Sequence, residues 1–173
     1  MKNFSEPLQS GKLTQEQALE IFDQLPLAEA DFMTGHWRGR ELITGHPMEG
    51  LLEASGWYGK SFFDPENVHP LVFGSRQKKF SGKPRLLFRL SVLPVPKFLI
   101  RPLMLLIRPL IQTRSSKARL RMMTYRGKVS ATMIYDDLPI CDTFRKITDR
   151  QVMGLMDRKG MEKPYFFTLE KED

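Results

Sequence analysis

The densest cluster of charged residues on the predicted strands lies between residues 136 and 146 and is the first candidate for chemistry. Catalysis by such a cluster requires one carboxylate held protonated by burial or by a second negative charge. No Ser-His-Asp arrangement, glycine-rich phosphate loop or zinc-helix motif accompanies it. We expect solvated ion pairs between neighbouring strands, with an anionic headgroup clamp by Arg145 and catalysis as alternatives. The cluster consists of Asp136, Asp137, Asp142, Arg145 and Lys146.

The three histidines, His36, His46 and His69, are ten and twenty-three residues apart, which fits no short metal-ligand motif. No carboxylate or cysteine lies at a recognisable spacing from them, so we expect no metal, haem or other cofactor. The lone Cys141 excludes an intramolecular disulfide and any multi-cysteine metal site. We expect it to be a small strand residue in a reducing compartment.

Positive charge is concentrated in the middle of the chain. Between Asn67 and Tyr135 there are fifteen of the 27 Lys and Arg residues and none of the 20 Asp and Glu residues. Long aliphatic runs separate these basic residues, most plainly between residues 86 and 111. This mixture favours an amphiphile with an anionic head, such as a phospholipid or fatty acid. Nucleic acid is the third alternative, because aliphatic rather than stacking aromatic side chains separate the basic ones.

The segment between residues 86 and 111 is long enough to span a bilayer, but Arg89, Lys97, Arg101 and Arg108 interrupt it. Each would cost about 2.5 to 3.5 kcal/mol at the bilayer centre, so we expect the segment not to cross a membrane. On a helical wheel Lys97, Arg101, Arg108 and Gln112 fall within about 60°. A helix with so narrow a polar stripe packs as a lid or homodimer contact, or docks on an anionic membrane.

The chain of 173 residues, 41% of them hydrophobic, is expected to form one domain, residues 1–173. Its first ten residues contain no apolar run of the length that a secretory signal needs. We therefore expect a cytoplasmic protein, peripheral at the inner membrane if the apolar segment docks there.

Local patterns predict the elements of the N-terminal half. Residues 13–25 predict a helix that opens with a capping box, Thr14 and Gln17, and ends at Pro26. A strand-like stretch at residues 31–44 and a short helix at residues 48–55 follow. The repeated Leu-Ile-Arg-Pro-Leu of residues 99–103 and 106–110 predicts two linked helical turns, each beginning at its proline.

The C-terminal half predicts an antiparallel meander. Strands at residues 119–125 and 128–136 flank Arg126-Gly127, which indicates a two-residue hairpin. Pairing Tyr125 with Lys128 separates an apolar face from a polar one, and a one-residue slip would mix them. Strands at residues 140–148, 151–156 and 165–170 follow, and such a meander commonly closes into a barrel. The apolar face carries Leu120, Met122, Thr124, Val129, Ala131, Met133 and Tyr135.

Two segments resemble a known bacterial pairing. Gly35-His-Trp-Arg-Gly39, continuing through Gly56-Trp-Tyr-Gly59 and Val68-His-Pro-Leu-Val-Phe73, looks like the glycine-x-tryptophan-x-glycine motif of the GXWXG family. The run from Ala118 to Lys146, with Gly154 to Gly160, looks like the domain of unknown function that accompanies it. The chain thus divides into modules at residues 31–74, 75–117 and 118–172, of which the middle one matches neither motif.

Gly-x-Trp near a first strand is also similar to the lipocalin and fatty-acid-binding group. That resemblance implies a mainly β, calycin-like antiparallel barrel around an apolar cavity, with an N-terminal helix and a helical cap. In that group the tryptophan plugs one end of the barrel, so Trp37 is expected to be structural, and Trp57 with it.

The leading hypothesis is non-enzymatic binding of a hydrophobic ligand with an anionic head, a phospholipid or a fatty acid. We assign the acyl chain to Leu120, Met122, Met133 and Tyr135, and the head to Arg121, Tyr125 and Arg145. The hairpin register, however, places Arg121 and Tyr125 on the face opposite the apolar one. The alternative is an enzyme acting on a small lipid-like substrate, or a haem-binding barrel, with Asp142 or a histidine at its centre.

Overall fold

The computed structural model describes residues 12–172, so the N-terminal segment in which the sequence predicts no secretory signal lies outside the described residues. The helices are α2 (Gln15–Gln24), α3 (Leu51–Ser55), α4 (Pro84–Leu90), α5 (Lys97–Leu106) and α6 (Arg108–Ile111), with a 3-10 turn, η1 (Asp31–Met33). The strands are β1 (Gly35–Glu41), β2 (Trp57–Asp64), β3 (Asn67–Gly74), β4 (Lys79–Gly82), β5 (Gln112–Thr113), β6 (Ala118–Tyr125), β7 (Lys128–Tyr135), β8 (Ile140–Thr148), β9 (Gln151–Arg158) and β10 (Tyr165–Lys171).

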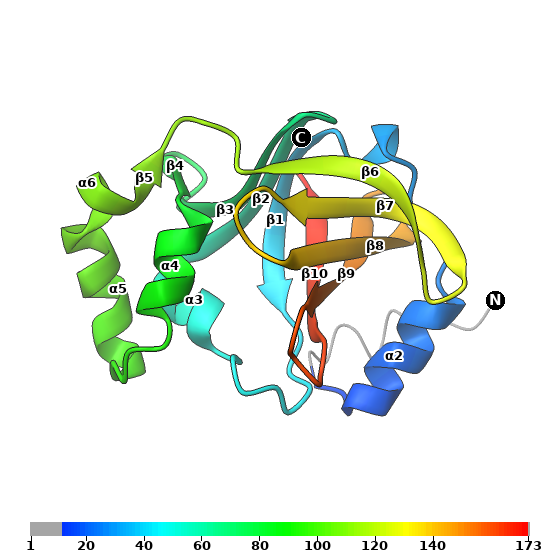
Figure 1. The fold of residues 1–173 in the computed structure, drawn as a ribbon, viewed down its shortest axis with the longest axis horizontal. Coiled ribbons are helices and arrows are strands. Elements are labelled where there is room, and N and C mark those ends of the chain that lie inside the picture. The colour runs from blue at the N-terminus through cyan, green and yellow to red at the C-terminus, as the bar shows by residue number, and fades with distance from the viewer. Residues whose placement is uncertain (1–11, 173) are drawn as a thin grey trace.

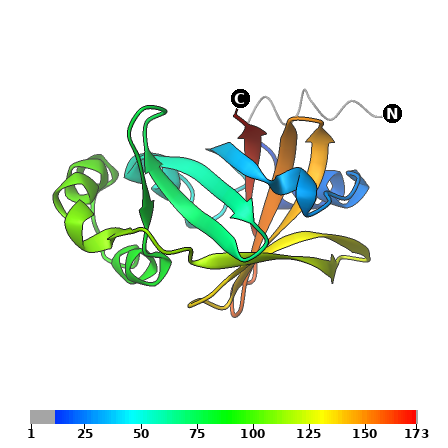
Figure 2. The ribbon, with the colours of Figure 1, turned by 90° about the horizontal axis from the view of Figure 1, so that it is seen from above.

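Eight of these strands close into a ring, in the order β1, β10, β9, β8, β7, β6, β3, β2 and back to β1. Every neighbouring pair is antiparallel, and β4 and β5 extend the sheet beyond β3. Helices α3 to α6 gather at one side of the ring and α2 lies at the other (Figures 1 and 2). The expected mainly β, antiparallel barrel with an N-terminal helix and a helical cap is confirmed.

The hairpin of β6 and β7 has the register expected from the sequence. Tyr125 lies opposite Lys128, and the pairing continues to Ala118 opposite Tyr135. Arg126 and Gly127 adopt φ values of 48° and 74°, as a two-residue type I′ turn requires. The alternation of apolar and polar side chains therefore specified the pairing correctly.

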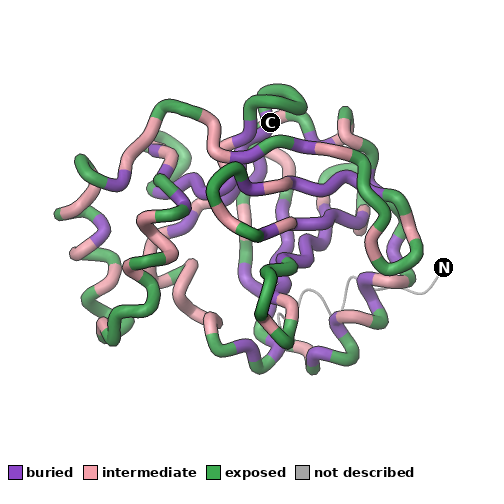
Figure 3. The backbone as a smooth tube through the Cα atoms, in the orientation of Figure 1, coloured by how far each residue is buried: buried purple, intermediate pink, exposed green. Residues whose placement is uncertain are grey.

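Two hydrophobic cores share the sheet. The larger fills the ring, and the smaller lies between α2 and the outer face of β9 and β10. The same strands are therefore buried on both faces, which Figure 3 shows as nearly continuous purple. Helix α2 is anchored by Phe22, whose ring packs edge to face on Phe166 at 6.5 Å. Its capping box, Thr14 with Gln17, is formed as expected.

The middle of the chain differs more from expectation. The stretch expected at residues 31–44 is a strand only over β1, the helix expected at 48–55 is the shorter α3, and helix α4 was not anticipated. Pro102 lies inside α5 rather than at a helix start, so that prediction was wrong, whereas Pro109 does lie at the start of α6. Within residues 12–172 no helix has the length and apolarity needed to cross a membrane.

Glycines in the sheet make room for the aromatic side chains of the core. The Trp57 ring lies against the backbone of Gly39, where any Cβ would overlap the indole. Trp37, which lies between Gly35 and Gly39 in β1, is fully buried, and its Nε1 donates to Met33 O at 2.7 Å. The spacing of the motif thus reflects tight packing between β1 and β2.

Candidate functional site

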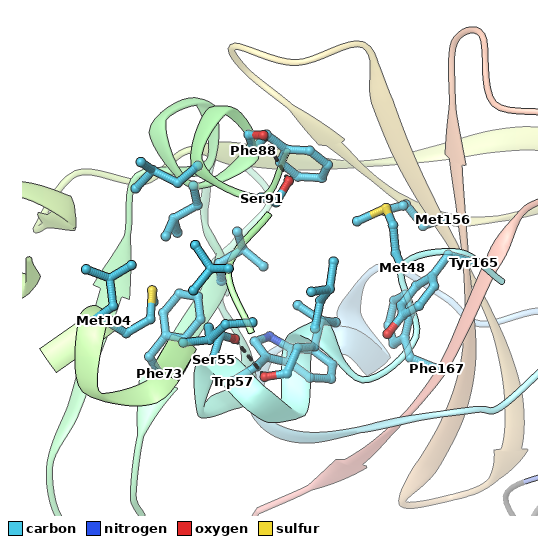
Figure 4. Close-up of a pocket in the computed structure, with 18 of the residues that line it drawn as sticks. Met48, Ser55, Trp57, Phe73, Phe88, Ser91, Met104, Met156, Tyr165 and Phe167 are labelled. Carbon is cyan, nitrogen blue, oxygen red and sulfur yellow. Dashed lines mark hydrogen bonds between the residues drawn. The ribbon is translucent and has the colours of Figure 1, made fainter. Parts of the chain in front are cut away.

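A cavity of about 150 Å³ lies between the mouth of the ring and the helices α3, α4 and α5 (Figure 4). Aromatic side chains from the strands form its floor, and aliphatic side chains from the helices form its roof. Its lining is almost entirely apolar. The lining residues include Met48, Leu52, Trp57, Lys60, Leu71, Phe73, Leu87, Phe88, Ile100, Leu103, Met104, Ile107, Tyr135, Asp142, Met156, Tyr165 and Phe167.

A bulge in β2 gives the cavity its polar residue. Trp57 and Lys60 are three residues apart, which in a regular strand would place them on opposite faces. The register between β2 and β3 shifts on both sides of Gly59, as a β-bulge does. Gly59 has a φ of 153° and its backbone lies against Trp37 O, so a side chain has no room there. Trp57 and Lys60 therefore both face the cavity.

Lys60 forms a buried ion pair with Asp142 of β8. Lys60 Nζ lies 2.8 Å from Asp142 Oδ2, and the two side chains are 3% and 1% exposed. Nζ also donates to Pro70 O at 3.0 Å. It lies 4.9 Å from the centre of the Phe167 ring and 5.8 Å from those of Trp57 and Tyr135. The ammonium is thus held by a carboxylate, a carbonyl and aromatic rings.

One oxygen of the Asp142 carboxylate takes no part in the ion pair. Asp142 Oδ1 is buried and accepts no hydrogen bond from any described residue. Burial raises the pKa of Asp142, and the charge and hydrogen bond of Lys60 oppose that rise. Burial likewise raises the pKa values of Tyr135 and Tyr165, so both phenols are neutral at ordinary pH. Within residues 12–172, Lys60 and Asp142 are the one ion pair that lines the cavity, and their opposite charges cancel.

A second polar group positions the roof. Both carboxylate oxygens of the buried Glu41 accept hydrogen bonds, from the backbone N–H groups of Gly50 and Leu52, at 2.8 Å each. These bonds fix the start of α3 to β1. His46 packs edge to face on Tyr165 at 5.3 Å, and burial lowers its pKa. Sequence reasoning missed both Lys60 and Glu41. The signal available for Lys60 was a charged residue within the aromatic segment of residues 57–63.

The residues assigned to the acyl chain separate in the structure. Tyr135 lines the cavity. Leu120 and Met133 are buried inside the ring but belong to its packed core rather than to the cavity wall. Met122 is 38% exposed, near the tip of the hairpin where the strands extend beyond the ring core.

None of the residues assigned to the anionic head lies at the cavity. Arg121 pairs with Glu66 on the outside of the ring. Tyr125 packs against the smaller core beneath α2. Arg145 is fully buried there too, with its guanidinium 5.2 Å from the Phe22 ring and Nη2 donating to Tyr125 O at 3.0 Å. These side chains point outward because inward and outward positions alternate along each strand.

The charged cluster at residues 136–146 does not form one site. Asp136 pairs with Arg119 at 3.7 Å and Lys146 with Asp149 at 3.3 Å, both at the surface, and Asp137 is exposed. Solvated pairing between strands is therefore correct for Asp136, whereas Lys146 pairs within its own turn. It is wrong for Asp142, which points inward with its strand neighbours Ile140 and Phe144. Cys141, facing the other way, is a strand residue as expected.

Two of the three histidines lie close together. His36 and His69 both pack on Phe63, with ring centres 5.6 and 5.5 Å away, and His36 Nδ1 lies 2.8 Å from Ser61 Oγ. His46 lies apart from them, against Tyr165. Across residues 12–172 no three His, Cys, Asp or Glu side chains are grouped to hold a metal ion.

The basic residues of α5 and α6 lie on the side of the helices that faces the domain. Lys97 Nζ donates to Glu49 O at 3.0 Å, and Arg101 lies beside Gly56 at the end of α3. Arg108 packs 4.6 Å from the Phe80 ring and donates to Gln112 Oε1 at 3.0 Å. Apolar side chains point to solvent instead: Val92, Leu93, Phe98, Leu99, Leu105, Leu106 and Leu110 are all exposed.

Comparison with known proteins supports the resemblance seen in the sequence. Residues 20–78 match the family described as GXWXG protein, and residues 116–171 match the domain of unknown function DUF4334. A crystal structure of a protein from Thermomonospora curvata is 31% identical, covering 99% of this chain and 97% of that one, with a TM-score of 0.74. No curated protein matches the chain. The chain therefore belongs to the GXWXG family and carries the DUF4334 domain that accompanies it.

Proposed function

We propose that the protein binds a hydrophobic small molecule in the cavity beneath α3, α4 and α5. The observation that carries this proposal is the cavity itself, an apolar space with a single charged pair at its floor. Ligand pockets in proteins are typically apolar, with a few polar groups that fix the orientation of the ligand. The ligand would place its polar end at Lys60 and Asp142 and its apolar part against Leu103, Met104 and Ile107.

The size of the cavity limits the ligand. An apolar cavity of about 150 Å³ accepts a molecule the size of benzene. A fatty acid, or one chain of a phospholipid, would enter with its first few carbons and extend between the helices of the roof. Most apolar side chains of these helices are only partly buried: on α5 Met104 is buried, while Ile100 is half-buried against the core. Fatty acid is therefore our first choice of lipid.

The exposed face of α5 supports a second part of the proposal, that this face docks on an anionic membrane. Phe98 and Leu106 are 77% and 78% exposed. The helical segment that carries this face, residues 84–111, contains five basic residues, Arg85, Arg89, Lys97, Arg101 and Arg108, and no acidic residue. A second copy of the chain would bring equal positive charges together, whereas anionic lipid complements them. A ligand could then pass between the bilayer and the cavity through the roof.

Filling the cavity tests the binding proposal. Ile100 and Leu99 are neighbours on α5; Ile100 lines the cavity, whereas Leu99 is 45% exposed and does not. We expect Ile100→Trp to abolish binding of a fluorescent fatty-acid analogue by occupying the space. Leu99→Trp introduces the same residue outside the cavity and should bind as the wild type does. Equal binding by both variants would place the ligand elsewhere and reject the proposal.

Catalysis on a small lipid-like substrate is the second candidate. It is favoured by one observation, a buried carboxyl group of raised pKa that faces an apolar cavity. Asp142 would act as a general acid or base. The two functions can be distinguished by incubating the protein with a simple lipid ester or alcohol and measuring the mass of that compound over time. Turnover that Asp142→Asn abolishes would support catalysis, and an unchanged ligand supports binding alone.

A further inference from the structure

The hydrogen-bonding capacity of the ion pair is not fully used inside the protein. Lys60 Nζ has three N–H donors, of which one reaches Asp142 Oδ2 at 2.8 Å and one reaches Pro70 O at 3.0 Å. The rings of Phe167, Trp57 and Tyr135 surround the remaining direction, and they attract the cation without accepting a conventional hydrogen bond. One donor is therefore available to a group that enters the cavity.

Asp142 offers the complementary acceptor. Its Oδ1 is buried, and no residue that the structure describes donates a hydrogen bond to it. A buried carboxylate oxygen without a donor is destabilising, so a donor that reached it would be strongly favoured. Both residues line the same cavity. An available donor and an unsatisfied acceptor thus lie side by side at its floor.

Charge decides which chemical group suits this pair. Lys60 and Asp142 together are neutral, and the surrounding wall is apolar. A carboxylate or phosphate would add an uncompensated negative charge beside Asp142, and an ammonium would add a positive charge beside Lys60. Either would be costly away from water. A neutral hydroxyl group adds no charge, donates one hydrogen bond and accepts another.

We propose that Lys60 and Asp142 bind the uncharged, hydroxyl-bearing end of a hydrophobic ligand, either an alcohol or a carboxylic acid in its protonated form. This inference rests on the proposed ligand-binding function. The O–H group donates to Asp142 Oδ1 and its oxygen, or the neighbouring carbonyl oxygen of an acid, accepts from Lys60 Nζ. The anionic head expected from the sequence would then enter only with a proton.

This requirement makes the binding of acids, but not of alcohols, depend on pH. A fatty acid is ionised in water above about pH 5, as Glu is, so it must take up one proton as it binds. Its affinity then falls about tenfold for each unit of pH. Burial raises the pKa values of the other titratable groups around Asp142 and so favours their neutral forms. These groups are Tyr135 of β7, Tyr165 of β10 and Cys141, next to Asp142 in β8.

His46 contacts Tyr165, so its protonation state also matters for the pH dependence of binding. Burial lowers its pKa, which moves its titration away from the range between pH 6.5 and 8.5, and titrations with 1-octanol at these two pH values would reveal any contribution from the protein's own groups. Lys60 is the remaining charged group that faces Asp142, and it is part of the proposed site. A pH dependence specific to acids can therefore be assigned to the proton on the ligand.

Calorimetric titration of the full chain with 1-octanol, octanoate and octylammonium at pH 6.5 and 8.5 tests the inference. We expect equal binding of 1-octanol at the two pH values, and octanoate weaker by about 100-fold at pH 8.5. Octylammonium should bind more weakly than 1-octanol at both. Octanoate that binds as tightly as 1-octanol and independently of pH would make Lys60 a simple anion site and overturn the inference.

The double variant Lys60→Met/Asp142→Leu provides the second measurement. It replaces the pair by apolar side chains of similar size, which proteins commonly tolerate, and circular dichroism would check its fold. We expect 1-octanol to bind at least about tenfold more weakly to it, because two hydrogen bonds are lost. Toluene, which has no polar end, should bind both proteins alike. If toluene and 1-octanol both fail to bind the wild type, the proposed function falls; if both bind and the variant retains 1-octanol, only this inference falls.

Discussion

Removing Lys60 alone should destabilise the protein far more than removing the whole ion pair. Lys60→Met leaves the carboxylate of Asp142 buried at 1% exposure with neither oxygen paired. Breaking a buried pair in this way typically costs about 3 to 5 kcal/mol, whereas replacing both members by apolar residues is often neutral or stabilising. The double variant Lys60→Met/Asp142→Leu should therefore be more stable than Lys60→Met.

The effect of Lys60→Met should also depend on pH in a defined direction. Burial raises the pKa of Asp142 in the folded protein, and Lys60 opposes the rise. A carboxyl group with a raised folded pKa binds protons more readily when folded. The free energy of unfolding therefore falls as pH rises from the pKa of Asp142 in the unfolded chain, about 3.9, to its higher pKa in the folded protein. Without Lys60 the folded pKa lies higher still, so the loss should be larger at pH 7.5 than at pH 5.

Urea denaturation of the three proteins at both pH values measures these differences. With an m value of about 2 kcal/mol per molar, a loss of 3 to 5 kcal/mol shifts the urea midpoint by about 1.5 to 2.5 M. The reasoning would be refuted if Lys60→Met were as stable as the double variant, or if its loss were greater at pH 5 than at pH 7.5. Either result would mean that Asp142 is not left buried and unpaired in the Lys60→Met variant.

Three further predictions follow from packing and surface. Trp37→Ala should lower the free energy of unfolding by about 3 to 5 kcal/mol; full stability with lost ligand binding would instead assign Trp37 to the ligand site. Gly39→Ala should be destabilised by about 1 to 3 kcal/mol because the new Cβ displaces the Trp57 indole, and adding Trp57→Phe should recover part of that loss in thermal unfolding. Phe98→Ser/Leu106→Ser and, separately, Arg85→Gln/Arg89→Gln, two exposed residues of α4, should each reduce co-sedimentation with anionic vesicles at low salt, each Arg contributing about 1 kcal/mol. Met122→Ser/Met123→Ser, exposed on the distant hairpin, should not, and equal binding to neutral vesicles would contradict docking by charge.

Local patterns in the sequence were sufficient for the elements that depend on neighbouring residues. The capping box of Thr14 and Gln17 and the register around Arg126-Gly127 both formed as expected, because each is determined within a few residues. The barrel followed from the meander and from the resemblance around Trp37.

The candidate site depends on long-range geometry that no local pattern carries. Lys60 meets Asp142 only because the ring closes and because a bulge at Gly59 turns Lys60 to the same face as Trp57. Without these two facts the sequence favours a surface ion pair for Asp142, with a catalytic centre as the alternative, and gives no role to Lys60. The helical wheel treated Lys97, Arg101, Arg108 and Gln112 as parts of one helix, whereas α5 ends at Leu106, Arg108 begins α6 and Gln112 lies in β5. It also could not show that Lys97 faces the domain while Phe98 and Leu106 lie in solvent.

Native mass spectrometry of protein purified without detergent tests the central claim, that the cavity holds a hydrophobic molecule, most directly. The wild type and Leu99→Trp should carry an additional mass corresponding to one small apolar molecule, either retained from the cell or added as 1-octanol. Ile100→Trp, with the cavity filled, should carry none. An additional mass that persists in Ile100→Trp, or a wild type that takes up no such molecule even when it is supplied in excess, would contradict the account.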